Sequence, residues 1–139
     1  AEDYSKFIEE LSRKVWDDFG RSGNISKITQ AYRKTYYQIA SRWLKERKQI
    51  IPCYAAYASC HITATGSVWP CCILGYEKPI GNLREVNYDF KAIWLSQRAD
   101  MFRAFLKQGT CSCPLANAHY TNILCNFSLM VRIMRHVFL

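Results

Sequence analysis

The sequence predicts an α+β fold that is mainly helical: two N-terminal helices, a β-hairpin plus helix around a metal site, and a C-terminal helix. Three observations lead to this prediction. Long segments near both ends carry apolar residues at three- and four-residue steps, the period of an amphipathic helix. Residues 53–75 contain no Lys, Arg, Asp or Glu and include short β-prone runs. The chain has seven cysteines in 139 residues, an odd number whose spacing is not that of a small disulfide scaffold.

The N-terminal part predicts two helices, at residues 3–19 and 25–49, and Pro52 stops the second. Asn24 or Ser26 is placed to cap the second helix. We expect one apolar stripe of each helix to pack in a core. The stripes are Phe7, Ile8, Leu11, Val15, Trp16 and Phe19 in the first helix, and Ile25, Ile28, Tyr32, Tyr36, Ile39 and Trp43 in the second.

The middle of the chain predicts a two-stranded antiparallel hairpin over residues 58–73, in which Gly66 supplies the positive φ of the turn. Such a hairpin is marginal in water by itself, so something must hold it. A loop at 79–83 follows, and then a third helix at 87–108, which Gly109 is placed to end. The buried side of that helix is expected to carry Phe90, Ile93, Trp94, Met101, Phe102 and Phe105.

Residues 115–138 predict a last helix that is apolar around more than one face. Such a helix normally lies between layers, so we expect it to meet a partner or another domain. The predicted division of the chain is therefore 1–51 for a helical region, 52–125 for a cysteine-bearing domain and 126–139 for the end of the apolar helix.

The net charge of +8 is concentrated between Lys27 and Lys48. A basic helix can bind nucleic acid through phosphates, but no nucleic-acid motif accompanies this one. We therefore expect a solvated face or a surface that meets another domain, and no nucleic-acid partner. No apolar stretch reaches the ~20 residues of a membrane span, and no apolar N-terminal run precedes a cleavage site. We expect a cytoplasmic protein without a membrane span or a retained signal peptide.

We expect four of the seven cysteines, which come from three separate places in the chain, to approach one another. Cys53 and Cys71 bracket the hairpin whose turn is Gly66, and Cys111 and Cys113 follow the third helix. Four thiolates that converge in this way describe a site for an iron–sulfur cluster or for zinc.

The other three cysteines are weaker candidates. Cys72 is an alternative to Cys71, but successive residues of a strand point to opposite faces. Cys60 and Cys125 are expected to be buried thiols rather than ligands.

This pattern resembles the auxiliary-cluster domain of radical S-adenosylmethionine (radical SAM) enzymes, known as the SPASM domain, or Twitch in its shorter form. That family's first motif is a cysteine, nine to fifteen residues, a glycine, four residues and a cysteine, and Cys53, Gly66 and Cys71 fit it. The resemblance covers about residues 52–125. Its other similar segments are Pro52-Cys53, Gly66-Ser67-Val68-Trp69-Pro70-Cys71-Cys72, Ile80-Gly81-Asn82-Leu83-Arg84-Glu85 and Ala92-Ile93-Trp94-Leu95-Ser96.

The resemblance implies a [4Fe–4S] cluster held by Cys53, Cys71, Cys111 and Cys113, beside the active site of a radical SAM enzyme. The late pair is Cys-x-Cys here, whereas Cys-x-x-Cys is commoner in the family. The few late cysteines do not suffice for the second cluster of the long form, which favours the one-cluster, Twitch-like version. Four cysteine ligands leave no open iron, so the implied role is electron transfer or structural support rather than substrate ligation.

The chain lacks the Cys-x-x-x-Cys-x-x-Cys motif and the strand–helix alternation of a radical SAM barrel. We therefore interpret it as the C-terminal part of such an oxidoreductase or maturase, a part that is not catalytic alone. The expected partners are the barrel of the parent enzyme and a peptide or small-molecule substrate, with self-association through the C-terminal helix in the fragment. The alternative from another class is a zinc-binding structural or interaction module.

Overall fold

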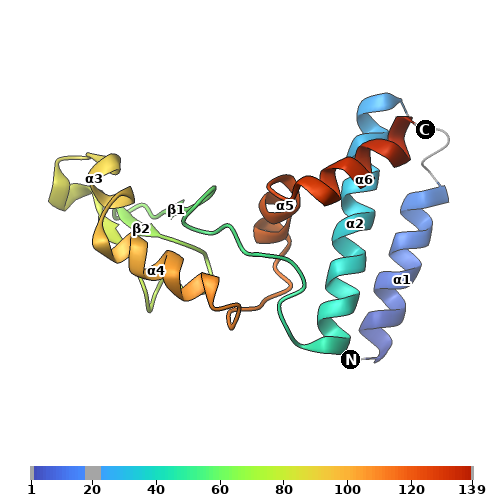
Figure 1. Cartoon of the computed structure of the whole chain (residues 1–139), viewed down its shortest axis with the longest axis horizontal. Helices are drawn as coiled ribbons and strands as arrows, with labels where there is room; N and C mark the ends of the chain where they lie inside the picture. The colour runs from blue at the N-terminus through green and yellow to red at the C-terminus, as the bar shows by residue number, and fades with distance from the viewer. Residues whose placement is uncertain (1, 18–22, 139) are drawn as a thin grey trace. The chain divides into compact units, whose positions relative to one another are not determined.

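The computed structural model describes residues 2–17 and 23–138, and the chain divides into two compact units. One unit, here called the helical unit, joins both ends of the chain, Ala1–Pro52 and Ser112–Leu139. The other, here called the cysteine unit, is Cys53–Cys111. Six α-helices and one three-stranded antiparallel sheet make up the described part of the chain, which confirms the predicted α+β, mainly helical class (Figure 1).

In the helical unit, α1 (Glu2–Asp17) lies along α2 (Asn24–Glu46), and α5 (Ala116–Leu124) and α6 (Phe127–Phe138) pack against α2 (Figure 1). The end of the predicted first helix, including Phe19, lies outside the described residues. The core of this unit consists of the buried residues Ala31, Ile39, Ile51, Ile123 and Ile133.

The predicted apolar stripes of α1 and α2 are only partly buried. Ile8 is 4% exposed and Ile39 also 4%, but Phe7 is 52% exposed and Ile25 is 84% exposed, so those two assignments were wrong. Ile25 lies in the first turn of α2, and Phe7 lies beside the face of α1 that Ile8 buries. Residues at the flank of a packed helix face, and residues at the end of a helix, stay exposed.

The bounds of α2 also differ from the prediction. Its N-cap is Gly23, without a side-chain capping hydrogen bond, so neither Asn24 nor Ser26 fills that role. The helix ends at Glu46, well before Pro52, because Arg47 takes a left-handed conformation (φ 51°) and donates its N–H to the Trp43 carbonyl at 2.8 Å.

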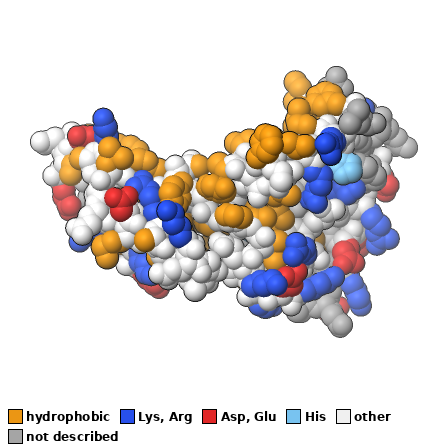
Figure 2. All heavy atoms as spheres, in the orientation of Figure 1, with side chains coloured by type: hydrophobic (Ala, Val, Ile, Leu, Met, Phe, Trp, Pro, Cys, Tyr) orange, Lys and Arg blue, Asp and Glu red, His pale blue; other side chains and the backbone are white. Residues whose placement is uncertain are grey.

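The basic segment of α2 carries exposed ion pairs. Arg42 and Lys48 both contact Glu46 at 2.9 Å, and Lys45 contacts Glu9 at 3.3 Å. Figure 2 shows red carboxylates among the blue Lys and Arg side chains on the visible face of the helical unit. Part of the positive charge is thus balanced locally.

The predicted last helix is in fact two helices, α5 and α6. The break falls at Asn126, whose Oδ1 accepts a hydrogen bond from the Leu129 N–H at 3.2 Å. Asn126 therefore caps a new helix. The apolar period continues across this cap, so the period alone predicts one helix rather than two. The expected second apolar face is confirmed: Ile123 and Ile133 are buried, while Leu124, Phe127, Met134 and Phe138 are each at least 40% exposed.

In the cysteine unit, β1 (His61–Ile62) and β2 (Ser67–Trp69) form the predicted antiparallel hairpin, and Gly66 has the expected positive φ of 86°. A third strand, β3 (Gly81–Asn82), pairs with the other edge of β2 where a loop was expected. Gly81 approaches Ile93 so closely that a Cβ there would lie 2.9 Å from its side chain. A strand of two residues is too short to show an alternating pattern.

The predicted helix at 87–108 is also interrupted. After η2 (Leu83–Val86), a 3₁₀ turn, come α3 (Phe90–Trp94) and α4 (Gln97–Lys107). Ser96 separates α3 from α4, since its Oγ accepts a hydrogen bond from the Ala99 N–H at 3.3 Å and caps α4.

Two details of α4 can be compared with the prediction. Gly109 follows the helix with φ 71° and donates its N–H to the Leu106 carbonyl at 3.1 Å, so its predicted role is confirmed. Met101 is 67% exposed rather than buried, because Phe102 and Leu106 occupy the inward face. No helix in the described part of the chain is long and apolar enough to span a membrane.

Candidate metal centre

Four cysteines pack against the hydrophobic core of the cysteine unit: Cys53, Cys60, Cys71 and Cys111. The core itself is formed by Ala55, Ala56, Val68, Ile80, Ile93, Ala99, Phe102 and Leu106. All four thiols are partly buried and none is in a disulfide. The structure therefore brings three of the predicted ligands, and Cys60 with them, onto one apolar core.

Cys71 is held by the turn that follows β2. Its Sγ accepts a hydrogen bond from the Leu74 N–H at 3.3 Å. Gly75 lies directly against the Trp69 ring, where a Cβ would come 2.2 Å from a ring carbon. Tyr76 contacts the same ring in a tilted arrangement, with centroids 4.3 Å apart and an interplanar angle of 55°. The turn thus fixes the sulfur and supplies an N–H···S hydrogen bond, a contact that influences the potential of a thiolate-bound cluster.

The loop between Cys53 and Cys60 is anchored to the helices of the same unit. The Arg103 guanidinium donates to the Ala56 carbonyl at 2.8 Å and to the Trp94 carbonyl at 2.7 Å. Ala56 is fully buried and has a φ of 58°, so the loop turns back through a strained residue beneath these helices. Sequence reasoning missed Arg103, because nothing in its local context separates it from a surface arginine.

Cys113 belongs to the helical unit, where three side chains hold the backbone around it. The Trp43 indole N–H donates to the Ser112 hydroxyl at 3.2 Å, and the Tyr36 hydroxyl donates to the Pro114 carbonyl at 3.0 Å. His119 Nε2 lies 2.7 Å from the Cys113 carbonyl. Three successive residues are therefore tied to α2 and α5, contacts that the apolar stripe of α2 did not predict.

Burial and one hydrogen bond define the environment of His119. The side chain is buried, and this burial lowers its pKa, although the hydrogen bond to the Cys113 carbonyl opposes the shift. A neutral imidazole that donates from Nε2 leaves Nδ1 as an acceptor, and Nδ1 is buried without a hydrogen-bond partner among the described residues. Burial likewise raises the pKa of the neighbouring Tyr36 hydroxyl.

The remaining cysteines differ from one another. Cys125 is exposed at the C-cap of α5, so the expectation of a buried thiol was wrong there. Cys60 is half-buried, and its burial raises the pKa of the thiol. Of the adjacent pair after β2, Cys71 is the one that packs against the core.

The thiols on the core are the type of ligand that an iron–sulfur cluster takes. Within residues 2–17 and 23–138, no three His, Cys, Asp or Glu side chains lie close enough together to hold a single metal ion. The four thiols on the core are surrounded by apolar side chains, in a unit whose residues 53–75 carry no charged group. Soft thiolate ligands in apolar surroundings are typical of iron–sulfur sites.

Comparison with known proteins identifies the segment that carries these thiols. Residues 53–114 match the family model SPASM, described as an iron–sulfur cluster-binding domain. No curated protein and no solved structure matched the chain. The matched segment begins at Cys53, includes Cys111 and Cys113, and ends before the exposed Cys125. Residues 53–114 of this chain are therefore similar to the iron–sulfur cluster-binding domains of the SPASM family.

Proposed function

We propose that this domain holds one [4Fe–4S] cluster as the auxiliary cluster of a radical SAM enzyme. The observation that carries the proposal is the packing of four partly buried thiols against one apolar core, inside the segment that matches the SPASM model. Bound there, such a cluster supplies one-electron redox chemistry and links segments of the unit covalently.

The proposed ligands are Cys53, Cys71, Cys111 and one further cysteine. The spacing of the sequence favours Cys113 as the fourth, and Cys60 packs on the same core as the other three. We propose Cys60 as the fourth ligand on that ground and keep Cys113 as the alternative. A raised thiol pKa is no obstacle to ligation, because a bound metal deprotonates a coordinating thiol.

The residues around the thiols have distinct roles in this proposal. The Leu74 N–H stabilises negative charge on the Cys71 sulfur. Arg103 holds the loop that carries Cys53 and Cys60. The apolar core excludes water, which lowers the local dielectric and so affects the potential.

The ligand assignment is tested by anaerobic reconstitution with iron and sulfide. Cys53→Ser and Cys71→Ser are expected to lose the cluster, whereas Cys125→Ser keeps the full iron content because Cys125 is exposed and outside the matched segment. Cys60→Ser and Cys113→Ser decide the fourth ligand, since only one of them should lose iron. If Cys125→Ser loses iron as fully as Cys53→Ser, the assignment is wrong.

We further propose that the apolar face of α5 and α6 meets the catalytic barrel of the parent enzyme. The face consists of Leu124, Phe127, Met134 and Phe138, all exposed. Large exposed apolar side chains that gather on neighbouring helices indicate an interaction surface. In the isolated chain this face is expected to cause self-association, which sedimentation of the wild type and of a Phe127→Glu/Met134→Glu variant would measure. A strictly monomeric wild type at high concentration counts against this surface.

A further inference from the structure

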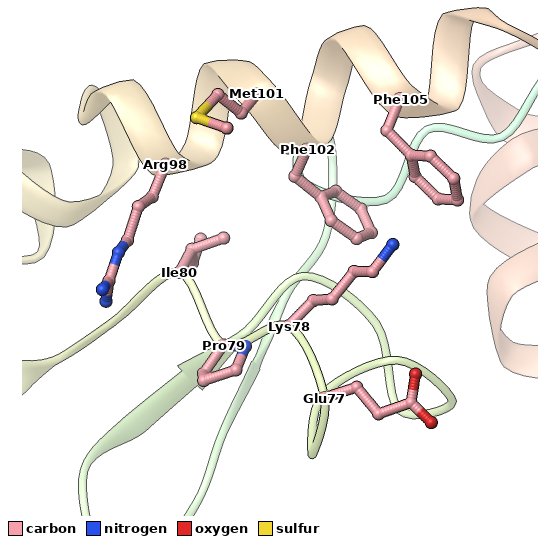
Figure 3. Close-up of a pocket in the computed structure, with 8 residues that line it drawn as sticks. All are labelled: Glu77, Lys78, Pro79, Ile80, Arg98, Met101, Phe102 and Phe105. Carbon is pink, nitrogen blue, oxygen red and sulfur yellow. The ribbon is translucent and has the colours of Figure 1, made fainter.

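A pocket of about 480 Å³ lies in the cysteine unit between α4 and the segment that precedes β3 (Figure 3). Five apolar side chains line it: Pro79, Ile80, Met101, Phe102 and Phe105. Two cations, Lys78 and Arg98, line it from opposite walls. A volume of this size is typical of sites for small organic molecules.

Both walls of the pocket are formed without a ligand. In the segment before β3, the Lys78 N–H donates to the Leu74 carbonyl at 2.8 Å, and the Ile80 N–H donates to the Val68 carbonyl at 2.9 Å. On the other wall, Phe102 is 5% exposed and anchors α4 in the core of the unit. A backbone that is already held in place lowers the ordering cost of binding a ligand.

The charged groups favour an anion. Arg98 makes no hydrogen bond or ion pair within the described part of the chain. The Lys78 ammonium lies 4.1 Å from the centroid of the Phe105 ring, as a cation–π contact, and so remains available to a second partner. One acidic residue, Glu77, also borders the pocket, but Figure 3 shows its carboxylate turned away from Arg98 and Phe102.

We propose that this pocket binds a small carboxylic acid with an aromatic or branched aliphatic body. The body packs on Met101, Phe102 and Phe105, and the carboxylate binds the Arg98 guanidinium. The Lys78 ammonium, held beside Phe105 at the other end of the pocket (Figure 3), adds positive charge without contacting the same carboxylate. A guanidinium matches a carboxylate in two parallel hydrogen bonds, and an exposed methionine adapts to apolar groups of different shape. Ile80 and Phe102 also belong to the core on which the cysteines pack, so the ligand would bind the same unit as the metal.

The test is calorimetric titration of the full chain with 3-phenylpropionate, beside its uncharged amide and the corresponding amine. The acid is expected to bind, the amide at least tenfold more weakly, and the amine not at all, since a charge-assisted hydrogen bond is worth about a factor of ten. Arg98→Gln should weaken the acid about tenfold, and Lys78→Gln should weaken it less, because Lys78 lies at the other end of the pocket (Figure 3). Lys107→Gln, an exposed change on the same helix outside the pocket, should leave its affinity unchanged.

Two further variants keep the test independent of folding and of the metal. Met101→Glu changes an exposed side chain and should abolish binding of the acid while the far-ultraviolet circular dichroism stays that of the wild type. Arg98→Gln should keep the wild-type iron content after reconstitution, so loss of ligand binding and loss of the cluster are separable. Equal binding of acid and amide, or an unchanged affinity in Arg98→Gln, overturns the proposal.

Discussion

The Arg103 side chain donates a hydrogen bond to the carbonyl of Ala56, which lies 2.8 Å away and 47 positions earlier in the chain. A second hydrogen bond from the same guanidinium reaches the Trp94 carbonyl at 2.7 Å. The Arg103 side chain is only 13% exposed, and an ion pair with Asp100 at 2.8 Å balances its charge. One side chain of α4 thereby joins the loop between Cys53 and Cys60 to the end of α3.

Replacement of this side chain is expected to weaken the whole cysteine unit. Arg103→Met keeps most of the volume but leaves two carbonyls without their donor, so we expect the free energy of unfolding to fall by about 2–4 kcal/mol. Urea denaturation followed by circular dichroism measures the loss. Lys107→Met, an exposed change on the same helix, is the matched control and should stay within about 0.5 kcal/mol of wild type. Equal stability of the two variants would show that the Arg103 contacts are dispensable.

The glycine against the Trp69 ring provides a second prediction. Gly75→Ala places a methyl group 2.2 Å from a ring carbon of Trp69, so the turn that holds Cys71 must move. We expect a loss of about 1–3 kcal/mol in urea denaturation and a lower iron content after reconstitution. Gly23→Ala is the control, because its Cβ would meet no atom within 4 Å. If Gly75→Ala matches Gly23→Ala in both measurements, the turn does not hold the thiol as described.

The tether of the Cys113 segment is tested by two adjacent tyrosines of α2. Tyr36→Phe removes the donor to the Pro114 carbonyl and should cost about 1 kcal/mol of unfolding free energy. Tyr37→Phe, one position along, removes a hydroxyl for which no hydrogen bond is found within the described residues, and should cost less than half as much. Thermal or urea unfolding of the two variants in parallel checks the difference. A larger loss in Tyr37→Phe contradicts the tether.

Thiol reactivity in the metal-free chain follows burial. The thiolate is the form that reacts, and burial raises the pKa of Cys60, so its thiolate fraction at pH 8 lies below that of an unshifted thiol. Cys125 is exposed and is expected to react with iodoacetamide several-fold faster than Cys60. Raising the pH toward 9.5 should reduce the difference between the two reaction rates, and 8 M urea should remove this difference. Mass spectrometry of digested samples measures both rates, and equal rates in the folded chain would contradict the burial of Cys60.

The sequence predicted those parts of the fold that depend on local signals. Gly66 marks the hairpin turn because φ of 86° suits glycine, and Gly109 ends α4 for the same reason. The breaks at Ser96 and Asn126 escaped prediction, because the apolar period continues across both and only the side-chain capping bonds reveal a new helix. The sequence did not predict strand β3, because a strand of two residues is too short to show an alternating side-chain pattern.

Only the spacing of the cysteines predicted the metal site. The motif that runs from Cys53 through Gly66 to Cys71 indicated the domain, and the family match agrees. A core cysteine and a ligand cysteine look alike in sequence, so Cys60 was assigned as a buried thiol, although it packs with the predicted ligands. Arg103 and the pocket between Lys78 and Arg98 depend on contacts between distant segments, which no local pattern contains.

The central claim is that the thiols of the segment that matches the SPASM model hold one [4Fe–4S] cluster. Anaerobic iron and sulfide analysis with electron paramagnetic resonance of the reduced protein tests it most directly. The account predicts a brown protein that absorbs broadly near about 400 nm and contains about four iron and four sulfide ions per chain. The signal should be lost in Cys53→Ser and Cys71→Ser and kept in Cys125→Ser. A colourless protein with one zinc ion per chain would contradict the account and support the zinc module instead.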